Sequence, residues 1–157
     1  MKRPEIKTLA NLEAAFAGES MAHIKYRYFA KIARAAGDED TALLFEETAA
    51  QEVQHALGHL DLLYPKETLS PVRCLEMAIA GETYEYTEMY PGFLKTAQQE
   101  GNAAAASEIH EQIAESKQHA EQFQATLVKA AKRFAALAKV EERHANQYRG
   151  ALAKVTA

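Results

Sequence analysis

Cysteine is almost absent from this sequence, which has a single one, Cys74, in 157 residues. One thiol cannot form an internal disulfide, a C-x-x-C redox pair or a four-cysteine metal site. We expect Cys74 to be a small, buried or half-buried residue at the start of a helix. Basic residues are not in excess either, since 18 Lys and Arg against 22 Asp and Glu give a net charge of −4. Without a basic footprint, nucleic acid and anionic membranes are poor candidates for partners.

Long apolar runs are also missing. No segment approaches 18 apolar residues, and the N-terminal stretch MKRPEIKTLANLEAAF has no apolar region of the signal-peptide kind. We therefore expect a soluble protein of a reducing cytoplasm. Valine and isoleucine together number 11, whereas alanine numbers 32 and glutamate 19. This composition favours helices and argues against a β-sandwich or a β-barrel.

The 4 prolines and 7 glycines are so few that they mark the ends of the predicted helices. We predict one domain over residues 1–157 with helices at about 8–36, 39–64, 71–100, 103–128 and 131–155. Thr8 or Asn11 is expected to cap the first helix, and Ser70 with Pro71 the third. Pro91 and Gly92 are expected to kink the third helix. Periodicity leaves open whether 103–155 is one helix or two, and we place a soft break near 128–131.

The C-terminal part contains an internal repeat. HAEQFQATL (119–127) matches HANQYRGAL (144–152) with a period of 25 residues, which is about seven helical turns. In an unbroken helix the two copies therefore lie on the same face.

Glutamate and histidine occupy stripe positions at which a packed helix would carry leucine. These residues are Glu19, the E-x-x-H of Glu52 and His55, the E-x-x-E of Glu82 and Glu85, and the E-x-x-H of Glu141 and His144. A buried carboxylate is costly unless it is paired or binds a metal, and residues three apart share one face of a helix. Two E-x-x-H motifs with glutamates from two further helices are typical of the di-iron or di-manganese site of ferritin-like bundles.

Each of these features alone has an ordinary explanation, because a lone glutamate on a helix is usually a solvated charge. A single E-x-x-H also arises by chance in a chain with 19 Glu and 6 His. We treat His23, His59 and His110 as such ordinary surface or core residues. The combination predicts an all-α, ferritin-like four-helix bundle with a long crossover between helices two and three. An additional or extended C-terminal helix completes the predicted fold.

Four stretches resemble the rubrerythrin family. They are FAGESMAHIKYRYFAKIA (16–33), FEETAAQEVQHA (45–56), AIAGETYEYTEMYPGF (78–93) and FAALAKVEERHANQY (134–148). The third is highly specific, and the resemblance covers essentially the whole chain. The chain is similar to the single-domain, sulerythrin-like form, because the rubredoxin domain of rubrerythrin needs four cysteines.

The resemblance implies a centre of two iron ions, with manganese or zinc as substitutes. In the family's pattern Glu19 and Glu82 are terminal ligands, one on each iron. Glu52 and Glu141 bridge the two irons, and His144 binds the second.

The resemblance also implies which residues serve the reaction. Glu85 matches the extra carboxylate that distinguishes the family, and one iron exchanges it for His55 on reduction. Tyr26 and Tyr90 match tyrosines that form hydrogen bonds near the metal centre, although aromatic residues on a stripe are often simply core.

One departure concerns the fourth helix. At the distance from the EGN turn where relatives have their second E-x-x-H, this chain has Ser116 and His119, with Glu115 one position out of place. We prefer Glu141 and His144, because serine cannot bridge two irons as a carboxylate does, and we keep Glu115 and His119 as the alternative. A continuous helix over 103–155 would span roughly 80 Å and reach a partner chain. We therefore expect a homodimer, with exchanged helices as one form of it.

The function that the resemblance implies is reduction of hydrogen peroxide to water in defence against oxidative stress. The electrons would come from an external donor, a rubredoxin-like protein or a flavoprotein. The alternative is a ferroxidase or iron-binding protein that uses dioxygen, and a third reading is a metal-free helical interaction protein.

Overall fold

The computed structural model describes residues 7–155, and helices are the only regular structure in that range. Residues 1–6 and 156–157 of the predicted domain lie outside the described part. The chain divides into two compact units, unit 1 (Met1–Leu69) and unit 2 (Ser70–Ala157). The all-α prediction is confirmed. None of the described helices combines the length and the apolar character that crossing a membrane requires.

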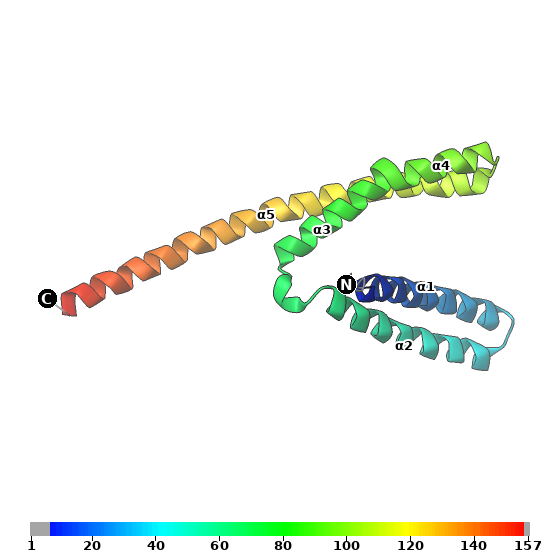
Figure 1. Ribbon diagram of the computed structural model, residues 1–157, viewed down its shortest axis with the longest axis horizontal. Helices are drawn as coiled ribbons and strands as arrows, with labels where there is room; N and C mark the ends of the chain where they lie inside the picture. Colours follow the sequence, from blue (N-terminus) through cyan, green and yellow to red (C-terminus); the bar gives the residue numbers. More distant parts are fainter. Residues whose placement is uncertain (1–6, 156–157) are drawn as a thin grey trace, which may run out of the picture. The chain divides into compact units, whose positions relative to one another are not determined.

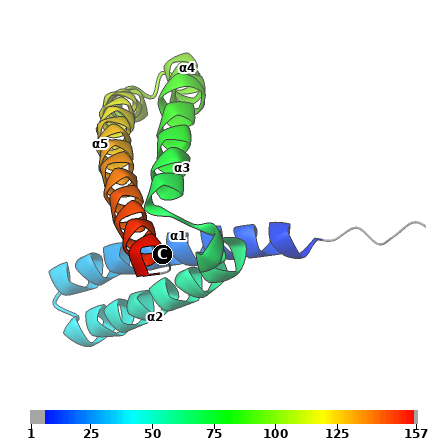
Figure 2. The same cartoon turned by 90° about the vertical axis from the view of Figure 1, so that its left-hand side faces the viewer.

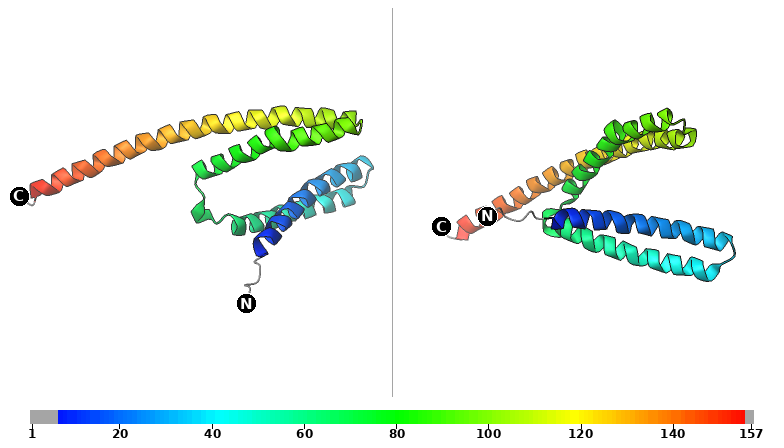
Figure 3. Two further views of the ribbon diagram at one scale, coloured as in Figure 1. Left: turned by 45° about the horizontal axis from the view of Figure 1, so that its top comes forward. Right: turned by 45° about the vertical axis from the view of Figure 1, so that its right-hand side comes forward.

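Unit 1 is a hairpin of two antiparallel helices, α1 (Thr8–Ala35) and α2 (Glu39–Leu63), which lie side by side (Figures 1 and 3). Gly37 ends α1 at a φ of 84°, a backbone conformation that favours glycine. Asp38 then caps α2, because its Oδ1 accepts a hydrogen bond from the Thr41 N–H at 3.0 Å. The prediction for the start of α1 was wrong, since the N-cap position is Lys7 and no side chain caps it.

Small residues form the seam between α1 and α2. Ala30, Ala42, Ala49 and Ala56 are buried there, so the two backbones approach closely. His23 also belongs to the seam, and its Nδ1–H donates to the Ala49 carbonyl at 2.9 Å. Two helices bury only one stripe each, and many larger apolar side chains of unit 1 stay exposed.

Unit 2 begins with α3 (Pro71–Tyr84), after a single 3₁₀ turn, η1 (Lys66–Thr68), in the connection. The predicted cap is confirmed: Ser70 Oγ accepts from the Arg73 N–H at 3.1 Å, and Pro71 is the first helical residue. Cys74 in the first turn is exposed, which corrects the expectation that it is buried or half-buried.

The helix that the sequence predicted at 71–100 is interrupted before Pro91. A π-helical turn, η2 (Glu85–Met89), separates α3 from α4 (Tyr90–Gln99), and the Tyr90 N–H donates to the Glu85 carbonyl five residues back. Pro91 has no N–H with which to continue the α-helical ladder, which accounts for a disturbance in the preceding turn.

The last helix, α5 (Ala103–Val155), runs unbroken for 53 residues, so the predicted break near 128–131 is wrong (Figures 1 and 2). Gly101, at a φ of 69°, ends the preceding turn, and Asn102 caps α5 by accepting from the Ala105 N–H at 3.1 Å. The first half of α5 packs along α3, η2 and α4 and buries Ser116, Ala120 and Ala130.

Candidate metal centre

The E-x-x-H of α2 and a glutamate of α1 meet in unit 1. Donor atoms of Glu19, Glu52 and His55 all lie within 4.8 Å of one another, so the three side chains could hold one metal ion. The α-helical spacing places Glu52 and His55 on one face, and their Oε2 and Nδ1 atoms are 2.9 Å apart. Both glutamates are half-buried, whereas His55 is exposed.

Glu52 carries a negative charge in this cluster. The His55 hydrogen bond, followed by one with Glu19, holds the pKa of the Glu52 carboxyl below its usual range. Glu52 is therefore an ionised carboxylate at neutral pH, the form that a cation needs. In unit 1 the sequence prediction of Glu19, Glu52 and His55 as neighbours agrees with the structure.

Unit 2 holds a second carboxylate cluster, formed by the E-x-x-E at the end of α3 and by the first half of α5. Ser116 Oγ donates to Glu85 Oε2 at 3.0 Å, and His119 Nδ1 lies 3.5 Å from Glu82 Oε2. Ser116 is almost fully buried, with 3% of its surface exposed. Sequence reasoning kept His119, together with Glu115, as the alternative to Glu141 and His144 and gave Ser116 no role; Glu115 is exposed.

One carboxylate oxygen of this second cluster lacks a hydrogen-bond partner in the described part of the chain. Glu82 Oε2 is buried and has no hydrogen-bond partner among the described residues, and the His119 nitrogen at 3.5 Å is too distant for a good bond. A buried, unsatisfied carboxylate oxygen is costly without a cation. Carboxylates with an imidazole suit iron or manganese, so the residues of both clusters fit the metal that the sequence predicted.

The two tyrosines that the sequence singled out have different surroundings. Partial burial, followed by the charges of Glu85, Glu82 and Glu108, raises the pKa of Tyr90, so its phenol stays protonated. The Tyr26 ring stacks on Phe45, with a centroid separation of 5.9 Å, and contacts Phe29. The geometry thus associates Tyr90 with the unit 2 carboxylates and places Tyr26 in an aromatic cluster.

Glu141 and His144 lie elsewhere on α5. Both are exposed, and at 1.5 Å per residue they are about 38 Å along the helix axis from Ser116 and His119. Because α5 does not bend back, unit 2 brings the first copy of the repeat to Glu82 and Glu85, and not the second. Within unit 2 the neighbour of Glu82 is therefore His119 and not His144, and which of them binds metal stays a prediction.

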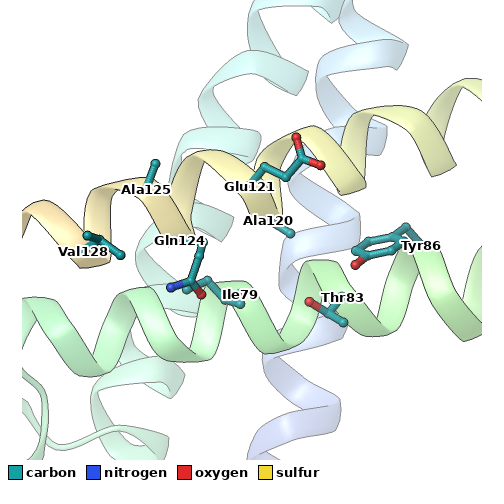
Figure 4. A pocket seen from close by; sticks show the side chains of 8 residues that line it. All are labelled: Ile79, Thr83, Tyr86, Ala120, Glu121, Gln124, Ala125 and Val128. Atoms are coloured by element: carbon teal, nitrogen blue, oxygen red, sulfur yellow. The ribbon is translucent and has the colours of Figure 1, made fainter.

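A hollow between α3 and α5 is not part of either cluster (Figure 4). It has a volume of about 430 Å³, and Ile79, Thr83, Gln124 and Val128 are among the residues that line it. The Glu121 carboxylate at its edge points away from α3 (Figure 4). The hollow therefore offers no convergent set of metal donors.

An all-α chain with carboxylates and E-x-x-H histidines on its helices is of the ferritin-like class. The family model for rubrerythrin matches residues 10–127, and the chain belongs to the rubrerythrin family. Rubrerythrins are ferritin-like di-iron proteins. The matched range includes Ser116 and His119 and ends before Glu141.

Several known proteins are similar to this chain. Nigerythrin of Nitratidesulfovibrio vulgaris is 44% identical over 110 residues, which are 62% of this chain and 54% of the relative. Rubrerythrin of Porphyromonas gingivalis is 39% identical over 119 residues, 69% of this chain and 59% of that protein. Rubrerythrin-1 of Clostridium acetobutylicum is 32% identical over 136 residues, 77% of this chain and 70% of that protein.

The chain thus spans less than two thirds of the length of several relatives. Among solved structures, a mixed-valence state of nigerythrin is 38% identical and covers 83% of this chain and 70% of its own, with a TM-score of 0.40.

Proposed function

We propose that the protein is a non-haem di-iron peroxidase that reduces hydrogen peroxide to water with electrons from an external donor. The observation that carries this proposal is the approach of Glu19, Glu52 and His55 to within 4.8 Å, in a chain of the rubrerythrin family. A cytoplasmic role in defence against oxidative stress belongs to the same proposal, as does a rubredoxin-like protein or a flavoprotein as donor.

The proposed ligands come from both clusters. Glu19, Glu52 and His55 are the donors of unit 1, and Glu82, Glu85 and His119 are the donors of unit 2. His119 replaces His144 in the set that the sequence suggested, since it is the α5 histidine in contact with Glu82. The family resemblance supports these residues as the ones that would hold two irons.

Reduction of one peroxide molecule consumes two electrons and two protons and yields two water molecules. Two ferrous ions, when bound, supply the two electrons together. The chain's own residues would orient the carboxylate ligands. The Ser116 hydroxyl, for example, donates a hydrogen bond of 3.0 Å to Glu85 Oε2. Tyr90 keeps its proton because its pKa is raised, so its O–H is available as a neutral hydrogen-bond donor beside the carboxylates.

Ser116 gives Glu85 a defined position that it can leave. A hydrogen bond to a charged group such as a carboxylate contributes about 1.5–3 kcal/mol, so a single one can open. Glu85 can therefore change its position within unit 2 when this bond opens. In unit 1, the exposed position of His55 leaves its imidazole room to move.

The experiment that tests this function is stopped-flow oxidation of the ferrous protein by hydrogen peroxide and, separately, by dioxygen. We expect the peroxide reaction to be the faster at equal oxidant concentration. Equal rates, or a faster reaction with dioxygen together with uptake of more than two irons per chain, would favour the ferroxidase function instead.

Glu85→Ala provides the matched variant. It should slow the peroxide reaction while most of the iron stays bound, because the other carboxylates remain. Glu88→Ala, an exposed glutamate in the same π-helical turn, is the control and should leave the rate unchanged. If both variants react as fast as the unmodified protein, Glu85 has no part in the reaction.

A further inference from the structure

The last 22 residues of α5 carry an apolar stripe that unit 2 leaves largely exposed, although Phe134 and Leu137 line one hollow with Pro71 of α3. Phe134, Leu137 and Tyr148 have exposed fractions of 51%, 57% and 76%. With Glu141, His144 and Ala151 they recur at alternating intervals of three, four, three, four and three residues, the pattern of a coiled-coil seam. We call residues 134–151 the α5 tail.

Apart from Glu141 in the seam itself, the charged residues of the α5 tail lie on the side away from this seam. Lys139, Glu142, Arg143 and Arg149 lie at outer positions of the heptads. The positions that flank the seam are occupied instead by Ala138, Val140, Ala145 and Gln147. An uncharged flank with small alanines suits close approach of a second helix, whereas a solvated helix would have no need of this segregation.

We propose that the α5 tail pairs with the α5 tail of a second copy of this chain, antiparallel, with Glu141 of each copy against His144 of the other. In an antiparallel pair, each a position of the heptad faces a d position of the partner helix. Phe134 then faces Ala151, Leu137 faces Tyr148, and Glu141 faces His144, and every pair occurs twice by the twofold symmetry.

The Glu141 and His144 pair selects this arrangement over its rivals. In a parallel pair Glu141 would face Glu141, and two carboxylates that face each other oppose association, while His144 would have no carboxylate partner. A shift of the antiparallel pair by one heptad in one direction would place Glu141 against Leu137, and a shift in the other would place His144 against Tyr148. In either case the polar Glu141–His144 contact is lost. The chosen register satisfies both polar residues and covers both large apolar ones.

Two further features of unit 2 permit this pairing. The tail is already helical as the continuation of α5, so no folding cost opposes association. The antiparallel direction also carries residues 103–133 of the two copies to opposite ends of the pair, where they do not collide. The inference does not rest on the proposed peroxidase function.

Disulfide cross-linking of the full chain tests both partner and direction. In a background with the exposed Cys74 replaced by serine, Leu137→Cys and Tyr148→Cys are made as separate variants and then mixed. On mild oxidation we expect the mixture to give a covalent dimer of the two variants and each variant alone to give little. Self-linking of Leu137→Cys alone would indicate a parallel pair and overturn the proposal, as would a mixture that does not cross-link.

Exchange of the polar pair provides a second test by sedimentation equilibrium. Glu141→His alone and His144→Glu alone each create like pairs, and each should weaken the dimer by about tenfold or more in dissociation constant. The double exchange recreates the opposite pairs and should restore the dimer. Single variants that associate as tightly as the unmodified chain, or a double variant that stays as weak as the singles, would contradict the register. Circular dichroism of every variant checks that α5 is still helical.

Discussion

The two carboxylate clusters of this chain use the same residue types, yet they differ in how well neighbouring side chains provide hydrogen-bond partners for the carboxylate oxygens. In unit 1, Glu52 has a hydrogen bond of 2.9 Å from His55 and a neighbour in Glu19. In unit 2, the histidine is 3.5 Å away, a serine stands where a second carboxylate is expected, and Glu82 Oε2 has no partner among the described residues.

The difference shows what a metal would add to each cluster. The i,i+3 spacing on one helix delivers a histidine to its own glutamate before any ion binds, as Glu52 and His55 do. Unit 2 draws its histidine from another helix, and that contact is too long to replace a ligand. We therefore expect metal binding to relieve a larger cost in unit 2, while unit 1 already holds its donors in position.

The largest expected effect comes from removing the best-placed donor of unit 1. Glu52→Ala should abolish binding of at least one of two irons, because it removes the carboxylate that both Glu19 and His55 approach. Bound iron is measured by colorimetric assay after removal of the excess. Glu47→Ala, an exposed glutamate of the same helix, is the control and should bind as much iron as the unmodified chain. Equal iron in both variants would exclude Glu52 as a ligand.

The next effect separates the two copies of the repeat. His119→Ala should weaken iron binding by about tenfold or more, since even removal of a residue that only supports a metal ligand costs about 10–100-fold in affinity. Glu141→Ala combined with His144→Ala should leave the affinity within about twofold, because unit 2 holds these residues far from Glu82. A loss of iron in the second variant and not in the first would return the assignment to Glu141 and His144.

The two copies of the repeat show how much of the candidate site could be predicted from the sequence. Glu52 and His55 could be predicted as neighbours because helical spacing alone determines their contact. The choice on α5 could not, because it depends on where the Gly101 and Asn102 turn sets the helix against α3. Residue chemistry favoured the intact E-x-x-H, whereas packing brought Ser116 and His119 to the carboxylates.

The fold shows the same division between local and nonlocal information. Ser70 with Pro71 and the glycines at 37 and 101 were informative because caps and left-handed turns are local. The break near 128–131 was wrong because that stretch has only good helix formers and Val128, so nothing ends the helix. The π-helical turn before Pro91 was expected only as a kink, since a missing N–H disturbs a helix without dictating how it is accommodated.

A smaller effect concerns the stability of the metal-free protein. Glu82→Gln should raise its free energy of unfolding by about 1 kcal/mol, because a neutral amide is less costly to bury than an unpaired carboxylate oxygen. Thermal unfolding in the presence of a chelator measures it. Glu85→Gln is the comparison and should not stabilise, since Glu85 already accepts from Ser116. If the two variants shift the midpoint equally, the two glutamates are equally satisfied and the contrast within unit 2 fails.

The smallest expected effect is a difference between the two units in how their stability depends on pH. Thr41 hydrogen bonds lower the pKa of Asp38 from 3.8, and the Arg34 side chain lowers that of Glu46 from 4.5. A lowered pKa in the folded state gives stability that is fully present above the ordinary pKa and is lost as the pH falls through the folded one. Unit 1 should therefore lose stability as the pH falls below about 5, whereas the caps of unit 2, Ser70 and Asn102, are neutral.

Asp38→Asn tests that contrast, because asparagine still caps a helix but does not titrate. The midpoint of thermal unfolding, followed by circular dichroism at pH 3, 5 and 7, should depend less on pH in this variant. An unchanged dependence would show that the cap of α2 has no part in the acid sensitivity. Because Asp38, Glu46 and Arg34 are exposed, added salt should also reduce the effect.

The central claim, that these carboxylates and histidines bind a pair of iron ions, is tested most directly by anaerobic titration of the full chain with ferrous iron. The expected result is two irons per chain, retained after gel filtration and absent from a Glu52→Ala, Glu82→Ala double variant that is still helical. Retention of fewer than one iron per chain by the unmodified protein would contradict the claim.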